Sequence, residues 1–266
     1  MFNLLFLNIC FYYMPSFIEL EGTCNTRDIG DIRTEYKRKI KPGILYRSDK
    51  LSYATNEDYN KLRSYGIKNI IDLRSDNEKK KEPNNVPNDF NYIEIPISVD
   101  KKILREIKLN LTYSRYNNIE NIMKRCNRDF IVKNSNDFAK VLNKILELKS
   151  PILFHCSFGK DRTGFVTALI YYICNVPKDE IYYEYLLSNK YIKKNIENEY
   201  SHFKKILNIE FEKIENLYPI LLVKHEYLYE SFNSAKNIYG SFSTFIREKM
   251  NFNESKQYQL RDFLLE

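Results

Sequence analysis

A short apolar segment that ends in a histidine and a cysteine constrains the fold of this chain more than any other feature. The segment PILFHC (151–156) is typical of a buried central strand, and RTGFVTALIYYICN (162–175) is typical of a largely buried helix. Five residues separate Cys156 from Arg162. A buried strand that leads through a short loop into a buried helix indicates an open α/β sheet, in which ligands bind beyond the carboxyl ends of the strands.

Segments before this strand support the same architecture. TNEDYNKLRSYG (55–66) predicts a helix, because Thr55 caps its start with Asp58 three residues on. IKNIIDLR (67–74) is a β-branched apolar run, and FNYIEIPIS (90–98) alternates, so both predict strands. Strands that alternate with helices predict an α/β domain with a mostly parallel central sheet flanked by helices.

The later part of the chain is predicted to be helical. In the helix expected at 135–150, Ser135 is predicted to cap the start, and Phe138, Val141, Leu142 and Ile145 share one face. Residues 190–266 read as helices with breaks at Pro219 and Gly240. We therefore expect a helical C-terminal half that covers the sheet.

The chain is predicted to form a single domain over 18–266, because no Gly-, Ser- or Pro-rich linker divides it. The charged, weakly helical stretch at about 100–133 is interpreted as a helical insertion. Residues 1–17 are interpreted as an N-terminal extension. For the apolar start three readings stay open: a packed or frayed extension, a wrongly assigned start with synthesis beginning at Met14, and a signal or anchor.

Composition narrows the class of protein. The net charge of +7 favours anionic ligands, but the lysines are spread along the chain, which argues against a nucleic-acid-binding protein. Five scattered cysteines fit neither a disulfide framework nor a zinc site. We expect a monomer in a reducing compartment such as the cytoplasm, with secretion through residues 1–13 as the alternative. No metal or other cofactor and no stable membrane insertion is expected.

The loop HCSFGKDRTG (155–164) carries the predicted chemistry. Gly159 permits tight curvature, so the amides of residues 157–160 (Ser157, Phe158, Gly159 and Lys160) converge on a tetrahedral dianion. Arg162 supplies two parallel N–H bonds to phosphate oxygens. The same positive field favours the ionised thiolate of Cys156, which attacks phosphorus and forms a cysteinyl-phosphate.

Two neighbours of the loop are assigned supporting roles. His155 is expected to hold the loop by hydrogen bonding, and Thr163 to donate its hydroxyl to the sulfur of Cys156.

The leaving group needs a general acid, and several carboxylates qualify. Asp161 inside the loop is the first candidate, and Asp72 at a strand end is the second. Asp100 and Asp129 in the helical insertion form the third. Asp161 also fits a structural role in the loop, and Asp72 fits an ion pair with Arg74 or Arg47.

The whole chain also resembles a known family. HCSFGKDRTG is similar to the active-site loop of cysteine-dependent tyrosine and dual-specificity protein phosphatases, in the bacterial and fungal branch with the loop HCxxGKDRTG. Five further segments resemble that branch in the same order: LEGTCNTRDIG (20–30), IKPGILYRSDKLS (40–52), IIDLRSDNE (70–78), EYLLSNKY (184–191) and YGSFSTFIRE (239–248). One departure is Asp31, which stands where a second glycine is usual.

The resemblance implies roles for single residues and a choice of substrates. It implies that Cys156 is the nucleophile and Arg162 the phosphate ligand, with Lys160 as a second cation near the phosphate. Asp161 becomes an acid or a water-orienting group. The implied residues that line or brace the pocket are Arg47, Asp72 and Arg74. The expected substrates are phosphotyrosine proteins, together with phosphoserine and phosphothreonine proteins. A phosphoinositide substrate and a non-catalytic phosphate-binding module are the alternatives.

Overall fold

The computed structural model describes residues 16–197, 200–201 and 214–266, and the apolar start at residues 1–13 lies outside this range. The strands are β1 (Arg27–Asp28), β2 (Leu45–Ser48), β3 (Asn69–Asp72), β4 (Asn91–Glu94) and β5 (Ile152–His155). They form one sheet in the order β1-β2-β5-β3-β4. The pairs β2–β5, β5–β3 and β3–β4 are parallel, and only β1 pairs antiparallel. The predicted mostly parallel sheet is confirmed.

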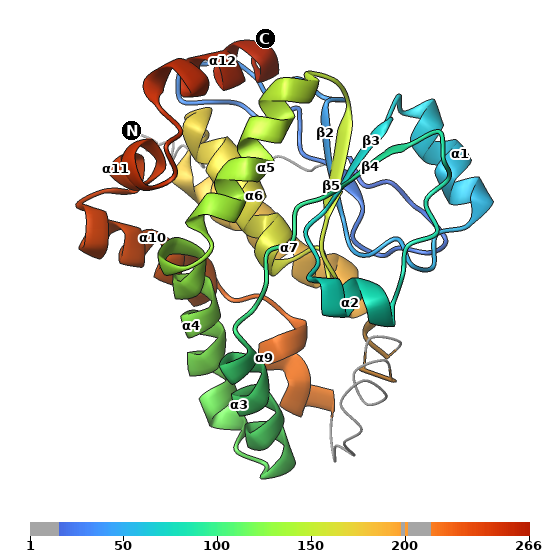
Figure 1. Ribbon diagram of the computed structural model, residues 1–266, viewed down its shortest axis with the longest axis vertical. Helices are drawn as coiled ribbons and strands as arrows, with labels where there is room; N and C mark the ends of the chain where they lie inside the picture. The colour runs from blue at the N-terminus through green and yellow to red at the C-terminus, as the bar shows by residue number, and fades with distance from the viewer. Residues whose placement is uncertain (1–15, 198–199, 202–213) are drawn as a thin grey trace, which may run out of the picture.

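Helices surround the sheet and make up most of the rest of the described chain (Figure 1). Before β5 they are α1 (Asn56–Ser64), α2 (Asp76–Lys81), α3 (Lys101–Thr112), the 3₁₀ turn η1 (Tyr116–Asn118), α4 (Ile119–Val132) and α5 (Ser135–Leu148). After β5 they are α6 (Asp161–Ile173), α7 (Lys178–Lys194), η2 (Ile214–Leu217), α9 (Tyr218–Leu221), α10 (His225–Tyr239), α11 (Phe242–Thr244), the π-helical η3 (Phe245–Lys249) and α12 (Glu254–Leu264).

The two faces of the sheet pack into two apolar clusters. Along β5, Ile152 and Phe154 enter the larger cluster, whereas Leu153 enters the smaller one with Leu62 of α1. This alternation is the two-residue period of a strand buried on both faces. In Figure 1, α5, α6 and α12 lie to the left of the sheet and α1 to its right. Almost all of α6 is buried, including the polar residues Arg162, Thr163 and Thr167, because this helix is covered on every side.

Local sequence signals account for several boundaries. Thr55 accepts from the amide of Asp58, and the Asp58 carboxylate accepts from the amide of Thr55, which is the predicted capping box of α1. After α1 the chain turns at Gly66 with φ +72°. Asp31 adopts φ +67°, so it takes the left-handed conformation for which a glycine is usual.

Two boundary predictions are wrong. Ser135 is the first residue of α5, and Asn134 occupies the cap position without a side-chain hydrogen bond. Pro219 does not break a helix, because it lies in the first turn of the short helix α9, where its missing N–H costs nothing. Gly240 does end α10, with φ +82°.

Helices α3 and α4 lie at one end of the molecule, at the bottom of Figure 1. They occupy the stretch interpreted as an insertion, and α4 packs against α10 and α9. The carboxyl end of β5 points toward this end of the molecule, next to α2. The loop that follows β5 thus lies at the carboxyl ends of the parallel strands, with helices on several sides.

Candidate active site

The loop from Cys156 to Lys160 joins the end of β5 directly to the start of α6. Its curvature depends on Gly159, which has φ +62°. A Cβ atom at this position would lie 2.5 Å from the carbonyl oxygen of Ser48 and 2.6 Å from the amide nitrogen of Asp49. No side chain fits there, so the loop can pack against the end of β2 only with a glycine at position 159.

Carbonyl groups of the loop are held from outside by Asn25, which lies just before β1, and by Arg47 of β2. The Asn25 side-chain amide donates to the carbonyls of Phe158 and Gly159, at 3.0 Å each. The Arg47 guanidinium also donates to the Gly159 carbonyl, at 2.5 Å. These contacts fix the orientation of two successive peptide groups.

A third carbonyl is fixed in the same way, because the amide of Lys50 donates to the Ser157 carbonyl at 3.2 Å. An amide N–H points away from the carbonyl of its own peptide plane. The amides of Ser157, Gly159 and Lys160 form no hydrogen bond to another described residue. The loop therefore presents backbone donors on its inner side, which is the arrangement that binds a tetrahedral anion.

A buried ion-pair network supports Arg47 from behind. Glu184 of α7 accepts from Arg47 at 2.5 Å and from Arg27 at 2.8 Å, and all three side chains are buried. Burial lowers the pKa of Arg47 to about 10, and the neighbouring Arg27 acts in the same direction. Arg47 still carries its charge at neutral pH. It braces the loop and does not approach from the substrate side.

Arg162, the second residue of α6, is bound on one side of its guanidinium. One terminal nitrogen, Nη1, donates to Glu78 at 2.8 Å and to the Ile97 carbonyl at 3.1 Å, and the other, Nη2, donates to Glu78 at 2.6 Å. Its Nε–H has no acceptor among the described residues. Nε and the second hydrogen of Nη2 are thus the pair available for a bidentate bond to phosphate.

Glu78 ties the loop to α2. Its carboxylate accepts from the Ser157 hydroxyl at 2.6 Å as well as from Arg162, and it completes a capping box with Ser75. Burial acts to raise the pKa of Glu78, but the Arg162 guanidinium outweighs it and the net pKa is lowered. The carboxylate is therefore ionised, and it orients both the arginine and the loop.

Asp161 lies at the start of α6 and pairs with its neighbour in sequence. One carboxylate oxygen, Oδ2, is 2.6 Å from the Lys160 ammonium. The other, Oδ1, is buried and has no hydrogen-bond partner in the described part of the chain. Lys160 is itself buried, so in this structure the cation assigned to the phosphate is bound to Asp161. The unpaired Oδ1 is a strong acceptor held next to the loop.

Asp72 and His155 form a buried hydrogen-bonded group behind the loop. Asp72 accepts two bonds from Arg74, at 3.0 and 2.8 Å, and one from Tyr92 at 2.5 Å. Burial acts to raise the pKa of Asp72, but its polar neighbours, among them Arg74 and Tyr92, lower it to about 2. A carboxyl that stays ionised at such low pH is a poor proton donor. Asp72 thus has the predicted ion pair with Arg74, and not the one with Arg47.

His155 is placed to hold the loop. Its Nδ1 lies 3.1 Å from the Cys156 carbonyl, and its Nε2 lies 3.0 Å from the side-chain amide of Asn84. Burial lowers the pKa of His155, so the ring is neutral. A proton on Nδ1 then bonds the carbonyl, and Nε2 accepts from Asn84.

The remaining acid candidates lie elsewhere. Asp100 and Asp129 both bind the ammonium of Lys133, at 2.9 and 2.8 Å, where the start of α3 meets the end of α4. The hydroxyl of Thr163 is buried without a hydrogen-bond partner in the described residues, so its predicted bond to the sulfur of Cys156 is not made here.

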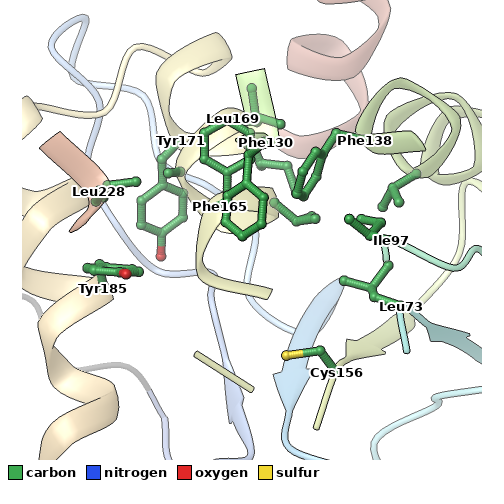
Figure 2. Close-up of a cluster of buried hydrophobic side chains, with 14 of the residues drawn as sticks. Leu73, Ile97, Phe130, Phe138, Cys156, Phe165, Leu169, Tyr171, Tyr185 and Leu228 are labelled. Atoms are coloured by element: carbon green, nitrogen blue, oxygen red, sulfur yellow. The ribbon is translucent and has the colours of Figure 1, made fainter. Parts of the chain in front are cut away.

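Cys156 is 2% exposed and borders the main apolar cluster. In Figure 2 it lies below a group of packed rings that includes Phe130, Phe138 and Phe165, whose centroids are 4.7 to 5.5 Å apart. The rigid aromatic packing fixes α6 and hence the start of the helix that Cys156 faces.

Three residues of the site were missed by the sequence reasoning: Asn25, Glu78 and Glu184. Glu78 had a signal, since Ser75 and Glu78 have capping-box spacing directly after a strand end. Glu184 and Ser188 lie one turn apart on α7 and both contact Arg27. Asn25 had no local signal, because its acceptors are more than 130 residues away.

Metal and membrane features are absent from the described residues. No group of three or more His, Cys, Asp or Glu side chains in that part of the chain is arranged to hold a metal ion. The helices described there are also too short or too polar to cross a membrane.

Known proteins resemble this chain over most of its length. A tyrosine-protein phosphatase of Cupriavidus necator is 26% identical over 226 residues, covering 85% of this chain and 81% of that protein. The triple specificity protein phosphatase PtpB of Mycobacterium tuberculosis is 28% identical over 267 residues, covering 86% of this chain and 92% of that protein. The crystal structure of P. aeruginosa TpbA aligns with a TM-score of 0.33 and 17% identity, over 56% of this chain and 71% of that chain.

The model of one protein family, described as the tyrosine phosphatase family, matches residues 18–266. This match includes the 156–161 loop, the strands that hold it and the helices on both sides of the sheet. The chain belongs to the tyrosine phosphatase family.

Proposed function

We propose that the protein hydrolyses phosphotyrosine in proteins through a cysteinyl-phosphate on Cys156, and that it also accepts phosphoserine and phosphothreonine. The observation that carries this proposal is the inner side of the loop. The bound carbonyls of Phe158 and Gly159 share their peptide planes with the amides of Gly159 and Lys160. These two amides, the amide of Ser157 and the Nε of Arg162 have no partner among the described residues, so they are available for an anion.

The proposed reaction has two steps. The Cys156 thiolate attacks phosphorus, the bond to the leaving oxygen breaks, and the phosphoryl group is held by Arg162 and the loop amides. Water then attacks the cysteinyl-phosphate, and the thiolate and inorganic phosphate are released. A proton must reach the leaving oxygen in the first step and leave the water in the second.

Asp161 is the carboxylate that we assign to these proton transfers. It adjoins Arg162, and its buried Oδ1 has no partner within the described residues. Asp72 is bound by Arg74 and Tyr92, whereas Asp100 and Asp129 are bound by Lys133. Oδ2 of Asp161 is bound to Lys160, so Oδ1 is the atom that we assign to both proton transfers.

A phosphoinositide is the second substrate class. The excess of lysine and arginine near α3 and α4 favours it, whereas the binding of Lys160 to Asp161 leaves one cation fewer for a multiply phosphorylated head group. We further propose that residues 18–266 act as one domain, with α3 and α4 as an insertion in it.

The test replaces the proposed nucleophile. Cys156→Ser is expected to abolish turnover of para-nitrophenyl phosphate while phosphate or a phosphotyrosine peptide still binds. Cys174→Ser is the matched control, since this buried thiol lies at the far end of α6. Turnover by Cys156→Ser at the rate of the native protein would exclude the mechanism.

The same preparation decides between the substrate classes. Phosphotyrosine, phosphoserine and phosphothreonine peptides are compared with phosphoinositides by phosphate release. Turnover of phosphotyrosine peptides is expected, and turnover of phosphoinositides alone would replace the proposed substrate.

A further inference from the structure

The lysines and arginines are spread along the chain, but its net positive charge is concentrated in one short part. Between positions 100 and 133 the sequence has nine lysines and arginines but four aspartates and glutamates, a net charge of +5, whereas the full chain has +7. These residues form α3, η1 and α4, which we call the α3–α4 layer (residues 100–133). The rest of the chain is nearly balanced.

The acidic residues of the layer are already paired. Glu106 binds Arg125, and both Asp100 and Asp129 bind Lys133. Glu120 binds Lys224 of the loop before α10. Seven cations of the layer are in no ion pair with a described residue: Lys101, Lys102, Arg105, Lys108, Arg115, Lys124 and Arg128. The described acidic residues thus leave these seven charges without an ion-pair partner.

Helix α3 presents three of these cations on one face together with apolar side chains. Its inner stripe is Ile103, Ile107 and Leu111, which pack into the main core. On the exposed side, Lys101, Arg105 and Lys108 follow one another at spacings of four and three residues, with Leu109 beside them. Leu104 is 53% exposed and Leu109 is 44% exposed.

The residues directly after α3 also combine an exposed apolar side chain with a cation. Tyr113, directly after α3, is 64% exposed, and the guanidinium of Arg115 lies 5.6 Å from the centre of its ring. The side chains there are a tyrosine, which has an apolar body and a polar tip, and an arginine that lies over its ring. Such residues favour the boundary between water and lipid.

The layer lies beside the active site. The Cys126 thiol of α4 has its pKa raised to about 12, by burial first and by the nearby Asp161 carboxylate second. Figure 1 shows α3 and α4 at the end of the molecule toward which β5 points. A surface bound by α3 would thus be close to the 156–161 loop.

We propose that the exposed face of α3 and the adjoining tip at Tyr113 dock this protein on an anionic lipid surface. The lysines and Arg105 attract the lipid head groups, and Leu104, Leu109 and Tyr113 enter the interface. The head groups and acyl chains of a lipid surface satisfy the cations and the exposed leucines together, whereas the acidic side chains of a protein satisfy only the cations. Docking does not depend on the reaction at Cys156.

Vesicle sedimentation tests this proposal with the full chain. The probes are vesicles of phosphatidylcholine alone and of phosphatidylcholine with one-fifth phosphatidylserine. The native protein is expected to sediment with the anionic vesicles and not with the neutral ones, and less so as salt rises. Absence of binding to anionic vesicles at low salt would overturn the proposal.

Two charge variants locate the contact. Lys101→Glu with Lys108→Glu is expected to weaken binding by about 25-fold or more, because each cation near the surface contributes roughly fivefold. Lys68→Glu with Lys236→Glu is the matched control, with the same change in net charge at exposed positions outside the layer. An equal loss of vesicle binding in both variants would show that only the net charge of the protein attracts it to the vesicles. That result would overturn the proposal that α3 is the docking surface.

A third variant tests the apolar contribution. Leu104→Gln with Leu109→Gln keeps the charge and is expected to weaken vesicle binding severalfold while circular dichroism and turnover of a small aryl phosphate are unchanged. If this variant binds vesicles like the native protein and poly-L-glutamate competes fully, the face serves an acidic polypeptide and the lipid proposal fails. Loss of vesicle binding with normal turnover separates this proposal from the proposed function.

Discussion

The carboxylate of Glu78 and the guanidinium of Arg162 face each other in a parallel, two-bond arrangement, at 2.6 and 2.8 Å. Glu78 lies in α2 and Arg162 in α6, so the pair connects two segments that the sequence separates by 84 residues. Because Glu78 also accepts from Ser157, one carboxylate sets both the direction of the arginine and the shape of the loop.

Replacement of Glu78 by glutamine is therefore expected to impair catalysis. The amide removes the charge and one of the two acceptors, and charge-assisted hydrogen bonds of this kind correspond to about 10- to 100-fold in kcat/KM. Steady-state kinetics with an aryl phosphate measure the effect. The control is Glu147→Gln, which removes an exposed carboxylate paired with Lys144. Unchanged kcat/KM in Glu78→Gln would show that Arg162 needs no such support.

Asp161→Asn is expected to act most strongly on poor leaving groups. If Asp161 delivers the proton, kcat falls by roughly 100-fold or more for phenyl phosphate and much less for an activated dinitrophenyl ester. Asp129→Asn serves as the comparison, because that carboxylate is bound to Lys133 and lies outside the loop. An equal loss for both esters would make Asp161 a structural residue.

Alanine substitutions at two glycines with positive φ distinguish the cost of backbone strain from the cost of a steric clash. Gly240→Ala is expected to cost about 1 kcal/mol of the free energy of unfolding, because a Cβ there meets nothing within 4 Å and only the backbone is strained. Gly159→Ala adds a contact of 2.5 Å with the Ser48 carbonyl, so it should cost more stability and abolish turnover. Urea unfolding and kinetics on both variants check this, and equal behaviour would contradict it.

Acid stability is expected to depend on Asp72. Its pKa is lowered from 3.8 to about 2, so its contribution is full above pH 3.8 and disappears as the pH falls toward 2. The shift corresponds to about 2 kcal/mol. Asp72→Asn should be less stable than the native protein at pH 7, with a difference that narrows below pH 3.8. Urea unfolding followed by circular dichroism at several pH values measures it, and a constant difference would contradict it.

The sequence predicted those parts of the fold that short-range signals determine. The capping box at Thr55, the apolar strand β5 and the buried helix α6 follow from neighbouring residues. Ser135 was misplaced as a cap because serine is common at caps, yet the chain enters α5 through Asn134. Helix boundaries depend on one or two hydrogen bonds, which several adjacent polar residues can supply.

The site was predicted less completely, for a different reason. The loop residues were found because they are consecutive, and Arg47 was found through the resemblance. Glu184 was not found, since its partners Arg27 and Arg47 lie more than 130 residues earlier and only the folded sheet brings them together. Lys160 was assigned to the phosphate, whereas the structure shows it bound to the carboxylate beside it.

The order of the strands has a consequence for how the protein matures. Among the described residues β5 is the last strand, yet it occupies the centre of the sheet, between β2 and β3. Until it inserts, two strand edges stay open to other chains, and the loop has no anchors at Asn25 or Arg47. Sheet closure and assembly of the anion site are thus one event. Phosphatase activity in a preparation should then report the fraction of molecules with a closed sheet, and partly folded molecules should add nothing to it.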